Sequence, residues 1–266
     1  MRVIVTASHA HSIPAEILCE LLYRQGIRVD AVLVPSFLNI KRLLLLLRIF
    51  KFSELIQKVF LSVSSLRLKK HAYLSKQASN VDPISLLIDH EKIEIRGLPV
   101  WCKYRKSIYS SVPDLNSYQS CRFVDSISPD LVVYCGGGIL KQAFLQSSPV
   151  ILNAHAGPLP EVRGMNAAEW SALLSKKSEV TIHQIDSGID TGPIYAQFSY
   201  DISTISSVEE LRSLAVVTGI QGLVSVIKNF SIYSPRIINH SASSYPQYFR
   251  MAPILLSLLQ SRLRKR

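Results

Sequence analysis

The stretch PVILNAHAGPLPEVRGMNAAEWSALL (149–174) places a short apolar run, a loop rich in proline and glycine, and a second apolar run in succession. The first run is typical of a buried strand and the last of a helix. Side chains two residues apart in a strand lie on the same side, so Asn153 and His155 should point together where the strand ends. Open α/β sheets present ligand sites at strand ends. The stretch therefore predicts either a ligand site or a polar turn.

The rest of the chain alternates strands with helices in the same way. Apolar runs predict strands at 2–6, 28–34, 98–104, 130–134, 149–153, 179–185 and 192–202. Capping residues, prolines and amphipathic spacing predict helices at 12–26, 82–90, 115–127, 167–174 and 207–230. This order predicts an α/β fold: a Rossmann-like, mostly parallel sheet with helices on both faces and a helical C-terminal extension.

Composition narrows the class of protein. The chain has 266 residues, of which 48% are apolar, and this suits a globular protein with a sizeable core. Its four cysteines stand far apart and form no CxxC pair, so neither a zinc site nor a disulfide framework is indicated, and we expect no metal. The opening MRVIVTASHAH predicts a first strand and no signal peptide, so we expect a cytoplasmic protein.

The net charge of +11 is concentrated in two segments. Residues 38–76 hold nine lysines and arginines and one acid, and residues 211–266 hold eight and no acid. The remainder is mildly acidic, which argues against a nucleic-acid partner. Residues 37–61, which overlap the first segment, form an amphipathic helical pattern. This pattern favours packing on the domain or on a homodimer partner, and peripheral membrane contact is the alternative. The tail 255–266 allows the same two interpretations.

Two further segments stand out at loop positions. CGGGIL (135–140) follows a predicted strand, and its glycines allow a flat ligand to approach the backbone closely. HQIDSGIDTGPI (183–194) interleaves two aspartates with two glycines, so this tight loop can aim a carboxylate inward. Each segment alone is better explained by a turn.

Taken in order, the three segments resemble the formyltransferase family that uses 10-formyltetrahydrofolate. The family pattern is roughly Asn-x-His-x-Ser-x-x-Pro, then Arg-Gly, then an Asp-x-Gly loop after a Val-Thr-Ile-His strand. Here these elements are NAHAGPLP, RG and VTIHQIDSGIDTGP, and the likeness covers roughly residues 128–200. We expect a catalytic domain over 1–202, with a basic helical insertion at 37–76, and a helical extension over 203–266.

The resemblance implies roles for particular residues. Asn153 matches the residue that holds the formyl oxygen, His155 the one that assists proton movements, and Asp190 the carboxylate that works with that histidine. The folate donor is expected at Gly136, Gly137, Gly138, Ile139, Leu140, Asp186, Gly188 and Ile189. The acceptor is expected near His9, His11, Arg163, Gly164 and Asn166. Glu169 and Trp170, near Asn166, are further candidates for contact with the acceptor. Structural roles are the alternatives for Asn166, Glu169, Trp170, His183 and Asp186.

The chemistry of formyl transfer suits this set of residues. Attack of an amine on a formyl group creates a tetrahedral oxyanion, which an amide N–H stabilises. The amine must also lose a proton to a base that titrates near the working pH, and a histidine beside a carboxylate meets that need.

Departures from the family pattern reduce the range of acceptor substrates to be expected. Gly157 stands where a serine is usual, which predicts a changed loop contact. TASHAHSIP (6–14) lacks the glycine-rich phosphate loop of the glycinamide ribonucleotide enzyme, and 203–266 is too short and too helical for the β-barrel of the methionyl-tRNA enzyme. We therefore expect the acceptor to be a small-molecule amine, and an amino-sugar nucleotide is the best candidate. The alternatives are a hydrolase that gives the formyl group to water, or a binding protein that has lost its chemistry.

Overall fold

The protein is built on one twisted sheet of seven strands, seen in a computed structural model that describes residues 1–36, 82–236 and 245–265. The strand order is β3-β2-β1-β4-β5-β7-β8. The first five are β1 (Val3–Ala7), β2 (Val29–Pro35), β3 (Ile108–Val112), β4 (Leu131–Cys135) and β5 (Ile151–His155), and they run parallel. β7 (Glu179–Gln184) is antiparallel to both β5 and β8 (Ile194–Ser199). The predicted α/β class is confirmed.

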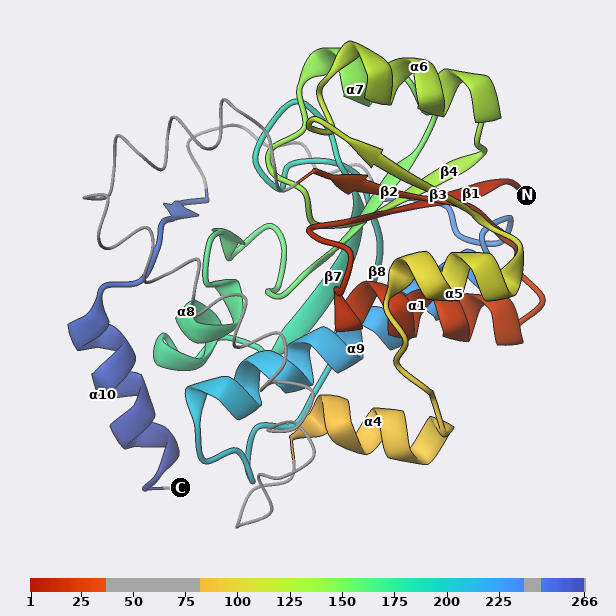
Figure 1. Cartoon of the computed structure of the whole chain (residues 1–266). Helices are drawn as coiled ribbons and strands as arrows, with labels where there is room; N and C mark the ends of the chain where they lie inside the picture. The colour runs from red at the N-terminus through yellow and green to blue at the C-terminus, as the bar shows by residue number, and fades with distance from the viewer. Residues whose placement is uncertain (37–81, 237–244, 266) are drawn as a thin grey trace, which may run out of the picture.

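Helices cover both faces of the sheet (Figure 1). One face carries α1 (Ile13–Arg24), α4 (Pro83–Glu91), α5 (Leu98–Arg105) and α9 (Val208–Lys228). The other face carries α6 (Tyr118–Ile127) and the short α7 (Gln142–Leu145). All five residues of β1 are buried, and all are apolar except Thr6, whose hydroxyl donates to the carbonyl of Gly136.

Local sequence signals fix the helix starts. Ser117 and Ser207 each accept a hydrogen bond from a backbone N–H three residues further on, which caps α6 and α9. Asp82 caps α4 in the same way, with Pro83 in the first turn.

The prediction of a strand at 98–104 is wrong. Gly97 and Pro99 start α5 there, because proline suits a first helical turn and Gly97 takes a φ of +92° at the N-cap. The strand beside it is β3, which begins shortly after the helix ends and is exposed at its first residue, Ile108.

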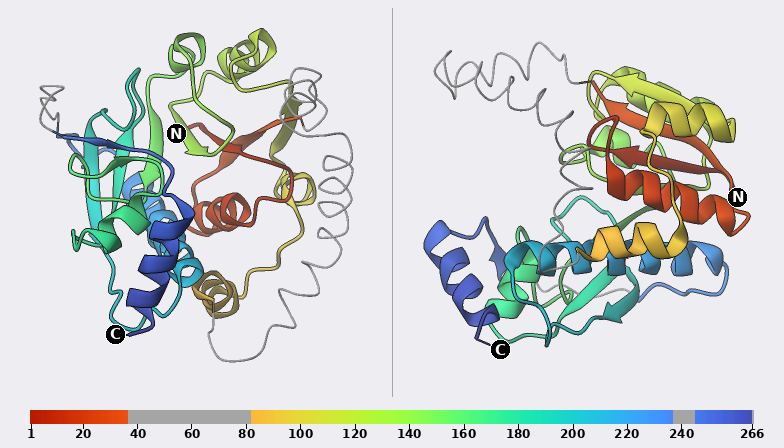
Figure 2. Two further views of the ribbon diagram at one scale, coloured as in Figure 1. Left: turned by 90° about the vertical axis from the view of Figure 1, so that its left-hand side faces the viewer. Right: turned by 60° about the horizontal axis from the view of Figure 1, so that its bottom comes forward.

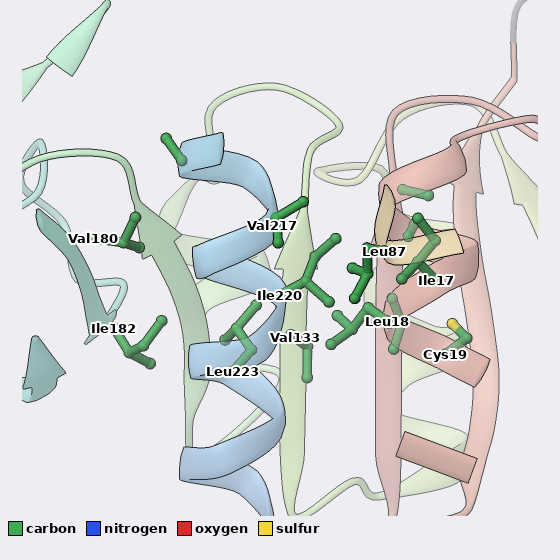
Figure 3. Packing of buried hydrophobic residues seen from close by; sticks show 14 of the residues in the cluster. Ile17, Leu18, Cys19, Leu87, Val133, Val180, Ile182, Val217, Ile220 and Leu223 are labelled. Carbon is green, nitrogen blue, oxygen red and sulfur yellow. The ribbon is translucent and has the colours of Figure 1, made fainter. Parts of the chain in front are cut away.

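The helix α9 belongs to the main hydrophobic core. Figure 3 shows its side chains Val217, Ile220 and Leu223 in one cluster with residues of β7 and α1. By length and hydropathy alone α9 could cross a membrane, but half of its most apolar window is buried inside the protein. The predicted boundary at 202/203 stays a prediction, and α9 lies on the same sheet as the elements before it.

The remaining elements lie at one side of the molecule. They are β6 (Arg163–Gly164), α8 (Ala167–Leu173), β9 (Gln247–Tyr248) and α10 (Pro253–Leu263), and β6 pairs with β9 as a separate two-stranded sheet. Figure 2 shows α10 on the outside, where it packs on α8 and α9. The predicted insertion, 37–61 within 37–76, falls outside the described residues.

Candidate active site

Asn153 and His155 lie at the carboxyl end of β5, as the strand pattern predicts. Asn153 pairs with His183 across the antiparallel β5–β7 ladder, and its Nδ2 lies 3.1 Å from Nε2 of that ring. His155 is buried, with 6% of its surface exposed. Both polar side chains therefore reach the same cluster, which β5 and β7 build together.

Asp190 joins the cluster from the loop between β7 and β8. Its Oδ2 lies 3.4 Å from Nδ1 of His155, and its Oδ1 lies 3.7 Å from Nε2 of His183. The backbone N–H of Gly164 donates to Oδ2 at 2.8 Å. Asp190 has a φ of +52°, a left-handed conformation that aspartate tolerates better than most residues. The structure thus brings together Asn153, His155 and Asp190, although Asp190 is far from the other two in sequence.

The two nitrogens of His155 both face oxygen atoms. Nε2 lies 2.7 Å from the carbonyl oxygen of Val162, which can only accept a hydrogen bond, so Nε2 carries a proton. Nδ1 faces the Asp190 carboxylate. Nδ1 is therefore the nitrogen through which the ring can take a proton from a reacting group and give it up again, beside the Asp190 carboxylate.

His183 is the member of this cluster for which the sequence pattern indicates only a strand residue. Burial, the largest cause, and the nearby His155 lower its pKa to about 4, against an opposing effect of Asp190. The ring is therefore neutral at pH 7. Nδ1 faces the carbonyl of Gln184 at 3.0 Å and must donate, so Nε2 accepts from Asn153. Its role becomes visible only when the β5–β7 pairing is known.

The loop between Asn153 and Gly164 is fixed by Thr181. The Thr181 hydroxyl donates to the carbonyl of Gly157 and accepts from the N–H of Leu159. A Cβ at Gly157 would lie 2.8 Å from Cβ of Ala167, so this loop has no room for the serine that is usual there.

The three glycines after β4 adopt left-handed backbone conformations. Gly136, Gly137 and Gly138 have φ values of +105°, +129° and +98°. The Gly136 carbonyl accepts from Thr6 and the Gly138 carbonyl from Tyr134, so both carbonyls are engaged within the protein. Of the two other predicted donor contacts, Ile139 is 76% exposed, whereas Leu140 is buried in the core cluster under α6 and α7. Leu140 can therefore offer a ligand only its backbone.

In the loop 186–192, the two aspartates have separate roles. Asp186 accepts from the N–H of Gly188 and from the hydroxyl of Thr191, so it forms the turn. Gly188 has no space for a side chain, since a Cβ would lie 2.1 Å from the Thr191 oxygen. Ile189 is 38% exposed and is available for contact.

The predicted acceptor residues fall into two groups. His9 and His11 follow β1, which β4 separates from β5 in the sheet. Arg163 and Gly164 form β6 beside Asp190.

Asn166 is not a free contact, because its amide donates to Glu169 and accepts from the N–H of Met251. Glu169 pairs with Arg212, and the Trp170 indole donates to the carbonyl of Phe249. These three side chains have partners inside the protein, and the acceptor contact expected of Asn166 stays a prediction. Among the described residues, His, Cys, Asp and Glu side chains form no group of three or more that could hold a metal ion.

Solved structures share this fold. A sugar N-formyltransferase from Shewanella sp FDAARGOS_354 superposes with a TM-score of 0.57 at 13% identity, over 99% of this chain and 87% of that one. The N-formyltransferase from Helicobacter canadensis, solved with folinic acid and dTDP-3-aminofucose, superposes with a TM-score of 0.55 at 16% identity, over 99% and 80%. Both likenesses concern the fold.

Sequence comparison gives the family. The methionyl-tRNA formyltransferase of Campylobacter jejuni subsp. doylei is 29% identical over 162 residues, which are 58% of this chain and 52% of that protein. The chain spans about half the length of the curated relatives it matches. The family described as formyl transferase matches residues 63–227, more than half of the chain and all of the Asn153–His155–Asp190 cluster. This chain therefore belongs to the formyl transferase family.

Proposed function

We propose that the protein transfers a formyl group from 10-formyltetrahydrofolate to a primary amine of an amino-sugar nucleotide. The observation that carries the proposal is the cluster of Asn153, His155 and Asp190 at the end of β5. His183 links Asn153, at 3.1 Å, to Asp190, at 3.7 Å, and Asp190 lies 3.4 Å from His155 and accepts from Gly164 at 2.8 Å. Family membership supports the reaction class, and the solved relative that holds folinic acid and a dTDP-amino sugar supports the choice of substrates.

The residues divide the chemistry as follows. The amine nitrogen attacks the formyl carbon, the new C–N bond forms, and the oxygen gains negative charge. Asn153 offers this oxygen an amide N–H, because its other amide hydrogen is engaged by His183. The bond from carbon to the folate nitrogen then breaks, and the proton lost by the amine returns to that nitrogen. His155, oriented by Asp190 and Val162, carries this proton from the amine nitrogen to the folate nitrogen.

The donor is proposed to lie against the backbone of 136–139 and the loop 186–192. Three successive glycines with positive φ let a ligand approach the backbone closely without side chains in the way. A flat heterocycle fits such a surface, because its ring edge can hydrogen-bond to backbone groups. The exposed Ile139 and Ile189 offer apolar contact nearby.

The decisive experiment is a competition between acceptors. Purified protein and 10-formyltetrahydrofolate are incubated separately with a panel of dTDP- and UDP-linked amino sugars, with glycinamide ribonucleotide and with methionyl-tRNA, and products are identified by mass spectrometry. A formamide on an amino-sugar nucleotide, absent with Asn153→Ala, supports the proposal. Formylated tRNA would show that the acceptor is a tRNA and not an amino-sugar nucleotide. Formate alone would indicate a hydrolase. The absence of product with every acceptor would count against enzymatic activity.

A further inference from the structure

The chain segment 245–251 lies along the loop that contains Gly164. The two parts are more than 80 residues apart in sequence, and they pair as β6 and β9 in parallel register, with Arg163 opposite Gln247 and Gly164 opposite Tyr248. The N–H of Met165 donates to the carbonyl of Tyr248 at 2.9 Å, and the Arg163 side chain donates to the carbonyl of Tyr245 at 3.3 Å. This pairing fixes the backbone of β6.

Side chains of α8 anchor the segment further along. The Trp170 indole donates to the carbonyl of Phe249 at 2.9 Å, and its ring lies 5.2 Å from the Tyr248 ring. The side-chain Oδ1 of Asn166 accepts from the N–H of Met251, and Met251 is 2% exposed. The segment is therefore held along its length by β6, by α8 and by the turn before that helix.

Gly164 connects this segment to the catalytic carboxylate. Its N–H donates to Oδ2 of Asp190 at 2.8 Å, and the same oxygen lies 3.4 Å from Nδ1 of His155. Its φ of +104° suits glycine, and a Cβ there would lie 2.1 Å from the carbonyl oxygen of Tyr248. Tyr248 thus sets where Gly164 lies, and Gly164 sets where one oxygen of Asp190 lies.

We propose that residues 247–251 are a positioning element for the Asp190–His155 pair and act through the amide of Gly164. The proposal rests on the proposed function for its catalytic meaning. A donor to a carboxylate selects one orientation of that side chain, and catalytic groups displaced by about 1 Å lose about 100-fold in rate. Trp170 is then a positioning residue, although it lies outside the reacting cluster.

The test compares the two tryptophans of the chain. Trp170→Phe removes the indole N–H that holds Phe249, and Trp101→Phe removes the equivalent N–H that donates to Glu20 at 3.0 Å between α5 and α1. We expect Trp170→Phe to lower kcat between about 3- and 10-fold, the effect of one neutral hydrogen bond, with the KM for the formyl donor unchanged. Trp101→Phe should leave both constants unchanged. Gly164→Ala should lower kcat at least about 100-fold.

A second measurement does not depend on turnover. The ring nitrogens of His155, assigned with a His155→Ala variant, report its contact with Asp190 in two-dimensional ¹H–¹⁵N spectra. We expect Trp170→Phe and Gly164→Ala to move these signals and Trp101→Phe to leave them in place. Unmoved His155 signals and unchanged kcat in both site variants would overturn the proposal. A wild type that formylates nothing would defeat the proposed function, whereas the spectra would still decide on the positioning.

Discussion

His183 holds the amide of Asn153 in one orientation, with Nε2 of the ring 3.1 Å from Nδ2 of the amide across the β5–β7 pair. The ring is neutral because burial lowers its pKa to about 4, and its Nδ1 proton faces the carbonyl of Gln184. Only Nε2 remains to accept, so the asparagine must present nitrogen, not oxygen, to the ring. Its second N–H is then left for a substrate oxygen.

Removing the His183 ring, which accepts the hydrogen bond from Asn153, should lower turnover without removing the Asn153 amide that serves as the oxyanion donor. We expect His183→Leu to reduce kcat about 10-fold, near the upper end for one neutral hydrogen bond, because the Asn153 amide can then rotate. His90→Leu is the matched control, since His90 is an exposed histidine on α4. Steady-state kinetics decide, and a kcat for His183→Leu equal to that of the control would contradict the orienting role.

Replacing Asp190 by asparagine should separate catalysis from folding. Asparagine tolerates the φ of +52° and keeps an oxygen for the Gly164 N–H, so the melting temperature should change little. The charge that faces His155 is lost, and we expect kcat to fall about 100-fold or more. Asn153→Ala and His155→Ala should cause losses of the same order. Near-normal turnover in all three variants would contradict the mechanism.

The buried neutral His183 should make stability fall in acid. The unfolded chain binds a proton at this histidine near pH 6.5, whereas the folded ring stays neutral down to about pH 4. Unfolding therefore takes up a proton in this window, and stability decreases as the pH falls from 6.5 to 4. We expect the decrease to be smaller in His183→Leu, by up to about 3 kcal/mol.

Urea unfolding of both proteins at about pH 7 and about pH 5 measures this difference. Titrating groups that lie away from His183 are common to the two proteins, so their contributions cancel. Parallel pH dependence in wild type and variant would show that His183 is not held neutral by the fold.

The glycine loop should be sensitive to a single methyl group. A Cβ at Gly137 would lie 2.4 Å from Cδ1 of Leu115, and φ at this residue is +129°. We expect Gly137→Ala to weaken binding of 5-formyltetrahydrofolate, a stable analogue of the donor, at least about 10-fold, because the loop must move.

Gly26→Ala provides the control for backbone strain alone. Gly26 has a φ of +75° in the turn after α1, and a Cβ added there would have no atom within 4 Å. This variant should lower the melting temperature and leave folate affinity unchanged. Equal affinities for Gly137→Ala and wild type by calorimetric titration would place the donor elsewhere.

Most of the sheet is predictable from sequence because its strands are buried on both faces. Residues such as Val3, Val5 and Val133 have no exposed surface, and each lies in an apolar run bounded by polar residues. The edge strand β3 escapes such a prediction, since Ile108–Val112 is partly exposed and carries two serines. The neighbouring α5 resembles a strand in sequence because most of its residues are apolar and, at eight residues, it is too short to show a helical period.

The site is predictable in part, for a similar physical reason. Asn153 and His155 are two apart in one strand, so local periodicity already relates them. His183 and Gly164 join the cluster through long-range contacts, namely the β5–β7 register and the bond to Asp190, which no local pattern encodes. The engagement of Asn166 depends on Met251, 85 residues away, and is equally hidden from local analysis.

The position of α9 decides where this chain tolerates new ends. The helix packs on α1, α4, β5, β7 and β8, so a protein cut between β8 and α9 would leave apolar side chains such as Val180 and Ile182 facing water. Such a fragment would aggregate instead of behaving as a minimal enzyme. Circular permutants should instead open at exposed turns such as the one at Gly26, where an added side chain would meet no atom within 4 Å.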